Sequence, residues 1–292
     1  MKILYLTKYF PPSHGGIETL SKNICDFFYK KKKYIEVCSF SKDKTYISYI
    51  NKYKINYFKT DLELFSTPIS FRMLRFISKR AKEFDYIHIH TPNPWSTICL
   101  IFSNPKKIIV SWGSDIINQK LLKFFFLYFQ NKLLNKAKKI ICLSKEYLNY
   151  SKDLSKFKRK TLIIPPIINT KKNLIRKKIL NKVQVVSIGR LVDYKSFETA
   201  INAFQYLPIN FRLKIIGSGK LRNKLNLLIK NLKLQKRVKI LSNINDDKKF
   251  SILKNSDIFI LCSNSRAESF GISILEAISF SLPLVISNVK GS

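Results

Sequence analysis

Short apolar runs alternate along the chain with amphipathic stretches whose apolar positions recur about every three to four residues. The runs predict β-strands and the amphipathic stretches predict α-helices. In the first half, the predicted strands are residues 2–7, 34–40, 86–90, 108–111, 139–143 and 161–164, and the predicted helices are residues 17–29, 72–82 and 119–136. Strands separated by helices in this way are typical of parallel α/β domains.

The same alternation begins again at residue 183. The predicted strands of this half are residues 183–188, 211–216, 238–241, 258–261 and 283–287, and the predicted helices are residues 197–204, 221–232, 247–254 and 272–280. Between the halves lies a polar, basic stretch with little strand pattern. We therefore predict an N-terminal domain over residues 1–170, a linker over 171–182 and a second domain over 183–292. Both domains are Rossmann-like, and such domains bind ligands at the carboxyl ends of their strands.

Composition agrees with two globular domains. The chain has 292 residues and 46% hydrophobic content, which is enough for two cores. Its apolar runs are shorter than the roughly 18 residues of a membrane-spanning helix. The first residues run into a strand pattern rather than a signal peptide, so we expect a cytoplasmic protein. The cysteines lie among apolar neighbours without a C-x-x-C pair, which indicates buried thiols, and the histidines show no metal-binding spacing.

The formal net charge of +36 is extreme. An anionic membrane surface attracts such a chain by about 1 kcal/mol per well-placed Lys or Arg, which favours peripheral association with the inner face of the cell membrane. The abundance of Lys, Ile, Asn, Phe and Tyr is also explained by the codon bias of an AT-rich genome. Membrane docking and codon bias both stay open. A nucleic-acid partner is not expected, because the chain lacks an aromatic–basic recognition motif and a zinc module.

Two carboxylates, Glu268 and Glu276, stand eight positions apart across a Phe-Gly turn. The turn follows a predicted strand and precedes a predicted helix, whose first backbone amides can take an anion. One acid before the helix terminus and one inside the helix can accept hydrogen bonds from sugar hydroxyls on either side of a phosphate. The spacing therefore predicts a nucleotide-sugar site.

A second candidate segment runs from Ser187 to Lys195, where a predicted strand ends at a glycine and Arg190 and Lys195 lie beyond it. Two cations at a strand end can neutralise a departing diphosphate without a metal ion. The alternative interpretation is a solvated basic loop.

The first half offers two more candidates. Gly15 and Gly16 join the first strand to the first helix, where the backbone can approach a phosphate or a sugar closely, although an ordinary turn fits as well. His90 ends a predicted strand, where an active-site residue belongs, but a core histidine fits equally. His88 is expected on the opposite face of that strand, in the core, so that the two histidines do not act as a pair.

Together these segments resemble the retaining GT-B glycosyltransferases of the glycosyltransferase 4 type, over nearly the whole chain. That family carries a Glu-x7-Glu signature, an Arg and a Lys after a strand-ending glycine, and a Gly-x-Gly turn like the one that begins at Gly217. The resemblance implies an α/β fold with two Rossmann-like domains facing across a cleft. It also implies that the second domain is incomplete, because family members continue with further strand–helix units.

The resemblance assigns the donor side. It implies that Arg190 and Lys195 bind the diphosphate, that Glu268 faces the transferred sugar and that Glu276 holds the ribose hydroxyls. The backbone that would contact sugar or phosphate belongs to Gly15, Gly16, Gly217, Phe270, Gly271, Ile272 and Ser273. Serine stands where the family usually has glycine at Ser196 and Ser281.

The resemblance also assigns the acceptor side. It places His90 at the reaction centre, and Asp115 and Gln119 in a segment similar to a family motif that reads Trp-His-Ser-Asp-Ile before a Gln-Lys pair. Gly113 takes the place of that motif's histidine, so a polar group near the acceptor is missing. The catalytic residues implied are His90, Glu268, Arg190 and Lys195.

The implied activity is retaining transfer of a hexose, with mannose favoured, from a GDP- or UDP-linked donor to a saccharide or lipid-linked acceptor in surface polysaccharide assembly. The resemblance implies no metal and no other cofactor. Two alternatives stay open. One is a non-catalytic, truncated unit that binds a nucleotide or an anionic membrane. The other is a different GT-B enzyme, such as a sugar-nucleotide epimerase.

Overall fold

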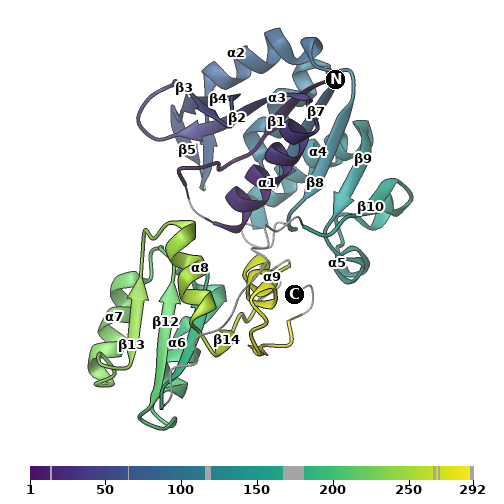
Figure 1. The fold of residues 1–292 in the computed structure, drawn as a ribbon. Helices are drawn as coiled ribbons and strands as arrows, with labels where there is room; N and C mark the ends of the chain where they lie inside the picture. Colours follow the sequence, from purple (N-terminus) through teal and green to yellow (C-terminus); the bar gives the residue numbers. More distant parts are fainter. Residues whose placement is uncertain are drawn as a thin grey trace. The chain divides into compact units, whose positions relative to one another are not determined.

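The structure is a computed structural model, and it describes residues 1–13, 15–64, 66–115, 120–166, 181–265, 268 and 270–289. The chain divides into two compact units, Met1–Ile167 (unit 1) and Ile168–Ser292 (unit 2). Each unit consists of a twisted sheet with helices on both faces (Figure 1). Residues 171–180 of the predicted linker lie outside the described residues. The limits predicted for the linker and the two domains therefore stay predictions.

Unit 1 is built on one large sheet with the strand order β10-β9-β8-β7-β1-β2-β4-β3. All neighbours are parallel except β3 and β4, which are antiparallel. The strands are β1 (Lys2–Leu6), β2 (Tyr34–Ser41), β3 (Tyr46–Ile50), β4 (Tyr53–Lys59), β7 (Tyr86–Thr91), β8 (Ile108–Trp112), β9 (Ala137–Cys142) and β10 (Thr161–Ile163), with a separate hairpin of β5 (Leu62–Leu64) and β6 (Thr67–Ile69). The helices are α1 (Gly16–Lys30), α2 (Phe71–Arg80), α3 (Pro94–Ser103), α4 (Lys120–Lys136) and α5 (Lys145–Tyr150), with 3-10 turns η1 (Ala81–Glu83) and η2 (Ser155–Lys160).

Alternation along the strands forms two cores in unit 1, because successive side chains point to opposite faces of a sheet. Leu4 and Leu6 of β1 lie in the core that includes side chains of α2, α3 and α4. Ile3 and Tyr5 lie in the other core, which α1 covers with Cys25 and its neighbours. The predicted burial of the thiols is confirmed for all the cysteines except Cys262, which is partly exposed, and all of them are unpaired.

Unit 2 has a fully parallel sheet with the strand order β13-β12-β11-β14-β15. Its strands are β11 (Val183–Ile188), β12 (Phe211–Ile216), β13 (Val238–Leu241), β14 (Ile258–Leu261) and β15 (Leu284–Ile286). Helices α6 (Phe197–Ala203) and α7 (Arg222–Asn231) pack on one face, and α8 (Asp246–Lys254) and α9 (Ile272–Ser279) pack on the other. A short 3-10 turn, η3 (Asp193–Lys195), follows β11.

Among the parallel strands, the order reverses between β1 and β7 in unit 1 and between β11 and β14 in unit 2. Loops that leave the carboxyl ends of the strands diverge at such a point and leave room for a ligand. Gly15 and His90 follow or end the strands at the first reversal, and Lys195 and Glu268 follow the strands at the second. The topology thus brings the predicted site residues to the two positions where ligands bind in this kind of sheet.

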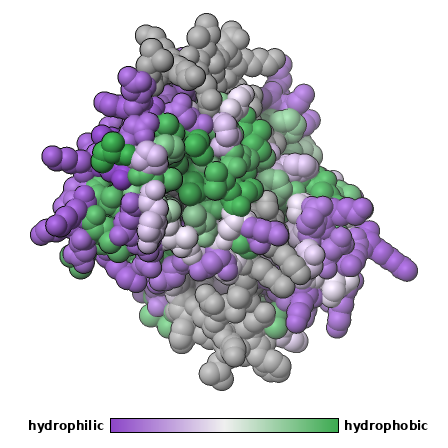
Figure 2. Space-filling view, turned by 90° about the horizontal axis from the view of Figure 1, so that it is seen from below, coloured by the Kyte–Doolittle hydropathy of each residue, from purple (hydrophilic) through white to green (hydrophobic). Residues whose placement is uncertain are grey.

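The predicted strands and helices are present with small differences at their ends. The pattern did not predict the antiparallel pair β3–β4, the hairpin β5–β6, or helices α3 and α5. Within the described residues, no helix is long and apolar enough to cross a membrane. Figure 2 shows hydrophobic residues gathered in one area of the surface, with hydrophilic residues projecting around it.

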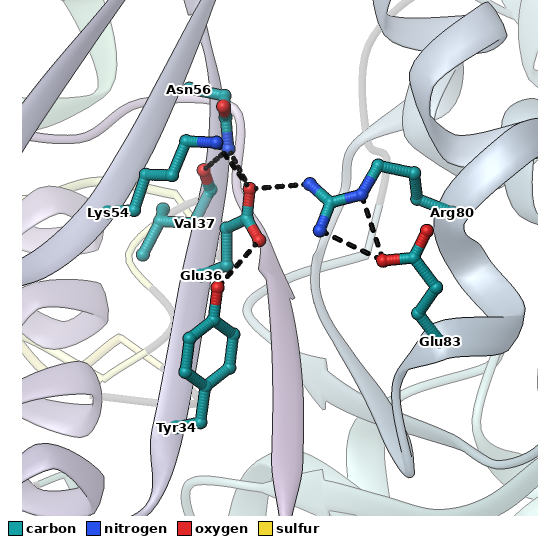
Figure 3. Close-up of polar contacts among 7 residues, drawn as sticks. All are labelled: Tyr34, Glu36, Val37, Lys54, Asn56, Arg80 and Glu83. Carbon is teal, nitrogen blue, oxygen red and sulfur yellow. Dashed lines mark hydrogen bonds and ion pairs between the residues drawn. The ribbon is translucent and has the colours of Figure 1, made fainter.

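A buried carboxylate lies near the amino end of β2 in unit 1. The side chain of Glu36 on β2 is fully buried and accepts hydrogen bonds from Arg80 at 2.9 Å, Asn56 at 2.8 Å and Tyr34 at 3.2 Å, with Lys54 at 3.4 Å (Figure 3). Burial raises the pKa of Glu36, but the hydrogen bonds from Asn56 and Arg80 and the nearby cations outweigh it, and the pKa is lowered. This cluster ties α2 to the sheet.

Replacing Arg80 by methionine is expected to lower the free energy of unfolding of unit 1 by about 3 kcal/mol, because Glu36 stays charged and buried with weaker compensation. Both tryptophans of the chain, Trp95 and Trp112, lie in unit 1, so urea titration followed by their fluorescence reports on this unit. The matched control is Arg75→Met on the exposed side of the same helix. Adding Glu36→Gln to Arg80→Met should recover part of the loss, and no recovery would contradict the electrostatic explanation.

Candidate functional site

Two glycine turns pack backbone against backbone at the carboxyl edge of the unit 2 sheet. The N–H of Gly189, just after β11, donates to the carbonyl of Ile216 at 3.0 Å, and the N–H of Leu191 donates to the carbonyl of Ser218 at 2.9 Å. A Cβ atom on Gly217 would overlap the carbonyl oxygen of Gly189 and lie 3.0 Å from its carbonyl carbon. Glycine at position 217 is therefore required for this close approach.

Lys195 and Glu268 form a buried ion pair beside these turns. Their side chains are 9% and 8% exposed, and the Lys195 ammonium contacts Glu268 Oε2, which also accepts a hydrogen bond from Ser263 Oγ at 3.1 Å. A Cβ atom on Gly189 would lie 3.0 Å from Cε of Lys195, so this glycine leaves space for the lysine stem. The sequence placed these two residues on the phosphate and the sugar separately, and the structure brings them into contact.

Arg190 and the turn before α9 complete this edge. Arg190 follows Gly189 directly and is exposed on the loop. Gly271 precedes α9 with φ 72°, in the left-handed region that favours glycine. The backbone amides of Ile272 and Ser273 then open the helix, where the N–H groups have no partner within the helix itself. Phe270 is half-buried beside them.

Glu276 lies on α9 and is 8% exposed. Its Oε1 accepts a hydrogen bond from Lys249 Nζ at 2.7 Å, and the same ammonium also contacts Asp246 at 2.9 Å. Burial lowers the pKa of Lys249, but the charge and hydrogen bond of Glu276, with help from Asp246, outweigh it, and the pKa is raised. The sequence did not predict Lys249, because nothing along the chain indicates that α8 packs against α9.

Two serines hold backbone conformations that usually belong to glycine. Ser196 has φ 46° directly after Lys195, and Ser281 has φ 54° two residues after the end of α9. These are the two positions where serine replaces the family's glycine. The left-handed backbone is thus kept at both positions, and the loop that presents Lys195 has its turn despite the substitution.

His90 is the last residue but one of β7, at the unit 1 reversal, and is 3% exposed. Neither of its ring nitrogens has a hydrogen-bond partner among the described residues, and burial lowers its pKa to about 4. His88 Nε2 lies 2.7 Å from Ser111 Oγ, and burial with the charge of His90 lowers its pKa to about 3. The expectation that the histidines face opposite sides was wrong, because residues two apart on a strand share a face.

Asp115 is fixed just after β8. Its Oδ1 accepts hydrogen bonds from Trp112 Nε1 at 3.0 Å and Ser151 Oγ at 2.6 Å, and its backbone N–H donates to the Tyr147 hydroxyl at 2.6 Å. Burial, together with the Asp115 carboxylate, raises the pKa of Tyr147. The carboxylate therefore has a defined position at the edge of unit 1 that carries His90.

Gly113 lies between these two groups in the sequence and is constrained by the fold. A Cβ atom there would lie 2.7 Å from the Thr91 carbonyl oxygen and 2.9 Å from His90 Nε2. The backbone as it stands does not admit the histidine that the family motif has at this position. Gly15 precedes α1 with extended backbone, and Gly16 begins that helix. Gln119 lies outside the described residues.

The two buried histidines predict a pH dependence of stability. Their pKa values are about 3 and about 4 in the folded chain against 6.5 when unfolded, so the unfolded chain binds more protons between these values. The histidines should therefore not make the unfolding free energy of unit 1 depend on pH above about pH 7. As the pH drops from 6 towards 4.5, this free energy should fall by up to about 2.7 kcal/mol per pH unit. Urea titrations followed by tryptophan fluorescence measure this slope.

The variant that tests the assignment is His90→Asn. It should remove about half of the histidine contribution to that slope, and its unfolding free energy should still not vary with pH around pH 7.5. A slope identical to that of the unchanged chain would show that His90 is protonated in the folded state.

Among the described residues, no group of three or more His, Cys, Asp or Glu side chains is placed to hold a metal ion.

Two family models match the chain and together span almost all of it. A model described as Glycosyltransferase Family 4 matches residues 14–172, and a model described as Glycosyl transferases group 1 matches residues 170–292. The first match covers more than half of the chain. The chain therefore belongs to glycosyltransferase family 4, a class of enzymes, which confirms the predicted family.

Curated relatives agree with this assignment. The chain is 26% identical to O-antigen chain mannosyltransferase C of Escherichia coli, over 98% of this chain and 79% of that protein. It is 24% identical to D-rhamnosyltransferase WbpZ of Pseudomonas aeruginosa, over 99% of this chain and 78% of that protein.

Solved structures share the fold. Anabaena HepE in complex with UDP matches with a TM-score of 0.70 and 18% identity, over 100% of this chain and 82% of that one. WaaG, a glycosyltransferase involved in lipopolysaccharide biosynthesis, matches with a TM-score of 0.69 and 15% identity, over 99% and 82%. The predicted α/β fold of GT-B type is confirmed.

Proposed function

We propose that this chain is a retaining glycosyltransferase that transfers a hexose, with mannose favoured, from a nucleoside diphosphate sugar to a saccharide or lipid-linked acceptor in surface polysaccharide assembly. The observation that carries the proposal is the buried Lys195–Glu268 pair beside two glycine turns at the unit 2 reversal. The names of the mannosyl- and rhamnosyltransferase relatives support the substrate class. We also propose that the protein works in the cytoplasm, at the inner face of the membrane that holds a lipid-linked acceptor.

In the proposed reaction, the bond between the anomeric carbon and the diphosphate oxygen breaks as the acceptor oxygen bonds to the same face of that carbon. The acceptor proton passes to the leaving phosphate, so the charges balance without a metal ion. Arg190 and Lys195 stabilise the diphosphate as its negative charge grows. Glu268 positions the hexose, and Glu276 accepts hydrogen bonds from the ribose. His90, neutral at pH 7, lies with Asp115 and Gln119 on the acceptor side.

The backbone atoms of the proposed donor site in unit 2 would come from Gly217, Phe270, Gly271, Ile272 and Ser273. For Gly15 and Gly16 of unit 1, a donor contact is proposed from the sequence resemblance alone. The first turn of α9, where Ile272 and Ser273 are half-buried, and the glycine turn at Gly217 would supply N–H groups and close access for phosphate oxygens.

The test is a thermal-shift titration with UDP- and GDP-linked hexoses. A ligand at 100 times its Kd should stabilise unit 2 by about 2.7 kcal/mol, and one base should give a much larger shift than the other. Glu276→Ala should remove most of the shift. The matched control is Glu198→Ala, whose carboxylate is 42% exposed in a surface pair with Lys224. A cooperative melt that neither nucleotide class displaces would overturn the proposed donor site.

Turnover separates this proposal from the alternative, a nucleotide-binding unit without catalysis. NMR of the product should show a new glycosidic bond with the anomeric configuration of the donor. Binding of the nucleotide sugar with neither transfer nor hydrolysis would favour the alternative.

A further inference from the structure

A basic cavity lies in unit 1 at the edge of the sheet opposite His90. Its volume is about 460 Å³, and it is lined from the end of α4 and from η2 by Asn131, Asn135, Lys156, Phe157, Arg159 and Lys160. Helix α4 ends where β9 begins, so the cavity lies at the amino end of a strand. His90 and Asp115 lie at the carboxyl ends of β7 and β8, which run parallel to β9. The cavity is therefore separate from the proposed acceptor side.

The charged side chains that line the cavity, Lys156, Arg159 and Lys160, are all cations. Lys160 Nζ donates to the backbone carbonyls of Asn135 at 2.9 Å and Ala137 at 3.3 Å, which offsets the negative end of α4. Burial lowers the pKa of this lysine. Lys156 and Arg159 are exposed, and neither makes an ion pair with any described residue. Like charges around one cavity repel each other, and an anion placed between them removes that cost.

Unpaired lysines alone would carry no argument, because the chain has 54 Lys and Arg against 18 Asp and Glu. The cavity adds groups that a surface patch lacks. Asn131 and Asn135 stand one helical turn apart on α4, so their carboxamides share a face and offer both donors and acceptors. Phe157 is 8% exposed and lies with its ring centroid 5.2 Å from Lys160 Nζ. The volume falls within the range of small-molecule sites.

We propose that this cavity binds a phosphate or diphosphate group, with Lys156 and Arg159 on the charged oxygens and the two asparagines on neighbouring hydroxyl or ester oxygens. The group is carried either by a soluble phosphorylated compound or by a lipid headgroup. This site goes beyond the proposed transfer reaction and does not depend on it, because none of its residues belongs to the donor or acceptor side.

The test follows the side-chain amide NMR signals of Asn131 and Asn135 during titration with inorganic pyrophosphate. These signals report on the cavity and not on the donor site. Saturable shifts are expected in the unchanged chain, with affinity at least tenfold weaker in the double variant Lys156→Gln, Arg159→Gln. The matched control is Lys42→Gln, Lys44→Gln, which removes the same charge from the exposed loop after β2 at the far side of the sheet.

Sedimentation with phosphatidylglycerol–phosphatidylcholine vesicles identifies the source of the phosphate. Loss of vesicle binding in the cavity variant but not in the control assigns a lipid headgroup. Unchanged vesicle binding, together with weakened pyrophosphate binding, assigns a soluble ligand. Equal pyrophosphate affinity in the cavity variant and the unchanged chain would overturn the site, whatever the vesicles show.

Discussion

Replacing Lys195 by methionine is expected to lower kcat/KM for sugar transfer by about a hundredfold to a thousandfold, the usual loss when a charge-stabilising donor is removed from a reaction centre. Methionine keeps the length of the stem that passes Gly189 and removes only the ammonium. Steady-state kinetics with the nucleotide sugar that gives the largest thermal shift measures the loss. The proposal predicts that kcat falls as well as the apparent affinity, because the leaving diphosphate carries more charge in the transition state than in the donor.

Two further variants separate catalysis from stability. Lys220→Met removes an ammonium that is 69% exposed and paired with Asp193. Asp193 begins the η3 turn that ends at Lys195. This variant should leave kcat/KM nearly unchanged. Lys195→Met leaves Glu268 buried with Ser263 as its remaining hydrogen-bond partner within the described part of the chain, so adding Glu268→Gln should restore stability but not activity. Activity within a few-fold of the unchanged chain in Lys195→Met would remove this residue from the mechanism.

Gly217→Ala is expected to destabilise unit 2 by more than about 3 kcal/mol, because the new methyl group would overlap the Gly189 carbonyl oxygen and no flexible side chain can move aside. Hydrogen exchange of the β11 and β12 amides should accelerate strongly. Tryptophan fluorescence, which reports on unit 1 alone, should show unchanged unfolding and serves as the internal control.

A glycine with a soft neighbour provides the contrast. In Gly15→Ala the atoms nearest to the new methyl group belong to the carboxylate at the end of the Glu18 side chain, and the backbone at position 15 is extended, so stability should fall much less than in Gly217→Ala. Normal protection of β11 and β12 in Gly217→Ala would show that the two turns can separate without cost, which contradicts the packing described here.

The sequence pattern predicted the parallel core well because its strands are apolar runs buried on both faces and its helices bury one apolar face. Two of the features that it did not predict, helix α3 and the pair β3–β4, were missed for different reasons. Helix α3 buries Thr97, Cys99, Leu100 and Ile101, so it has too few exposed positions to show an amphipathic pattern. Its start was hidden in a Pro-rich stretch, although Asn93 caps it and Pro94 takes the first helical position, as prolines often do.

The antiparallel pair β3–β4 carries a local signal in the sequence of its turn. Its strands are separated by Asn51 and Lys52, which have φ 48° and 70°. Positive φ at both central residues is the geometry of the two-residue hairpin turn. The two central residues of such a turn are usually Asn-Gly, and here they are Asn-Lys. The sequence of this turn is therefore similar to that of an ordinary polar loop.

The candidate site was predictable in part. Strand ends can be found from the apolar pattern, so the loops that carry Lys195, Glu268 and His90 could be placed at the carboxyl edges of the sheets. The partners of these residues could not be found in the same way. Lys249 reaches Glu276 from another helix, and Ser263 reaches Glu268 from the end of β14. Such contacts depend on how helices and loops pack in three dimensions, and no regular spacing of residues in the sequence indicates that packing.

The closed Lys195–Glu268 pair has a consequence for how the enzyme would tell its substrate from its product. Under the proposed function, Lys195 exchanges one counter-ion, the Glu268 carboxylate, for another, the diphosphate. Binding should therefore weaken with added salt less steeply than the number of phosphate contacts suggests. The displaced Glu268 carboxylate then needs a new donor. An intact nucleotide sugar supplies a hexose hydroxyl to it, whereas the free nucleotide diphosphate leaves it buried with the Ser263 hydroxyl as its remaining donor among the described residues. The ion pair would thus lower product inhibition without any moving loop.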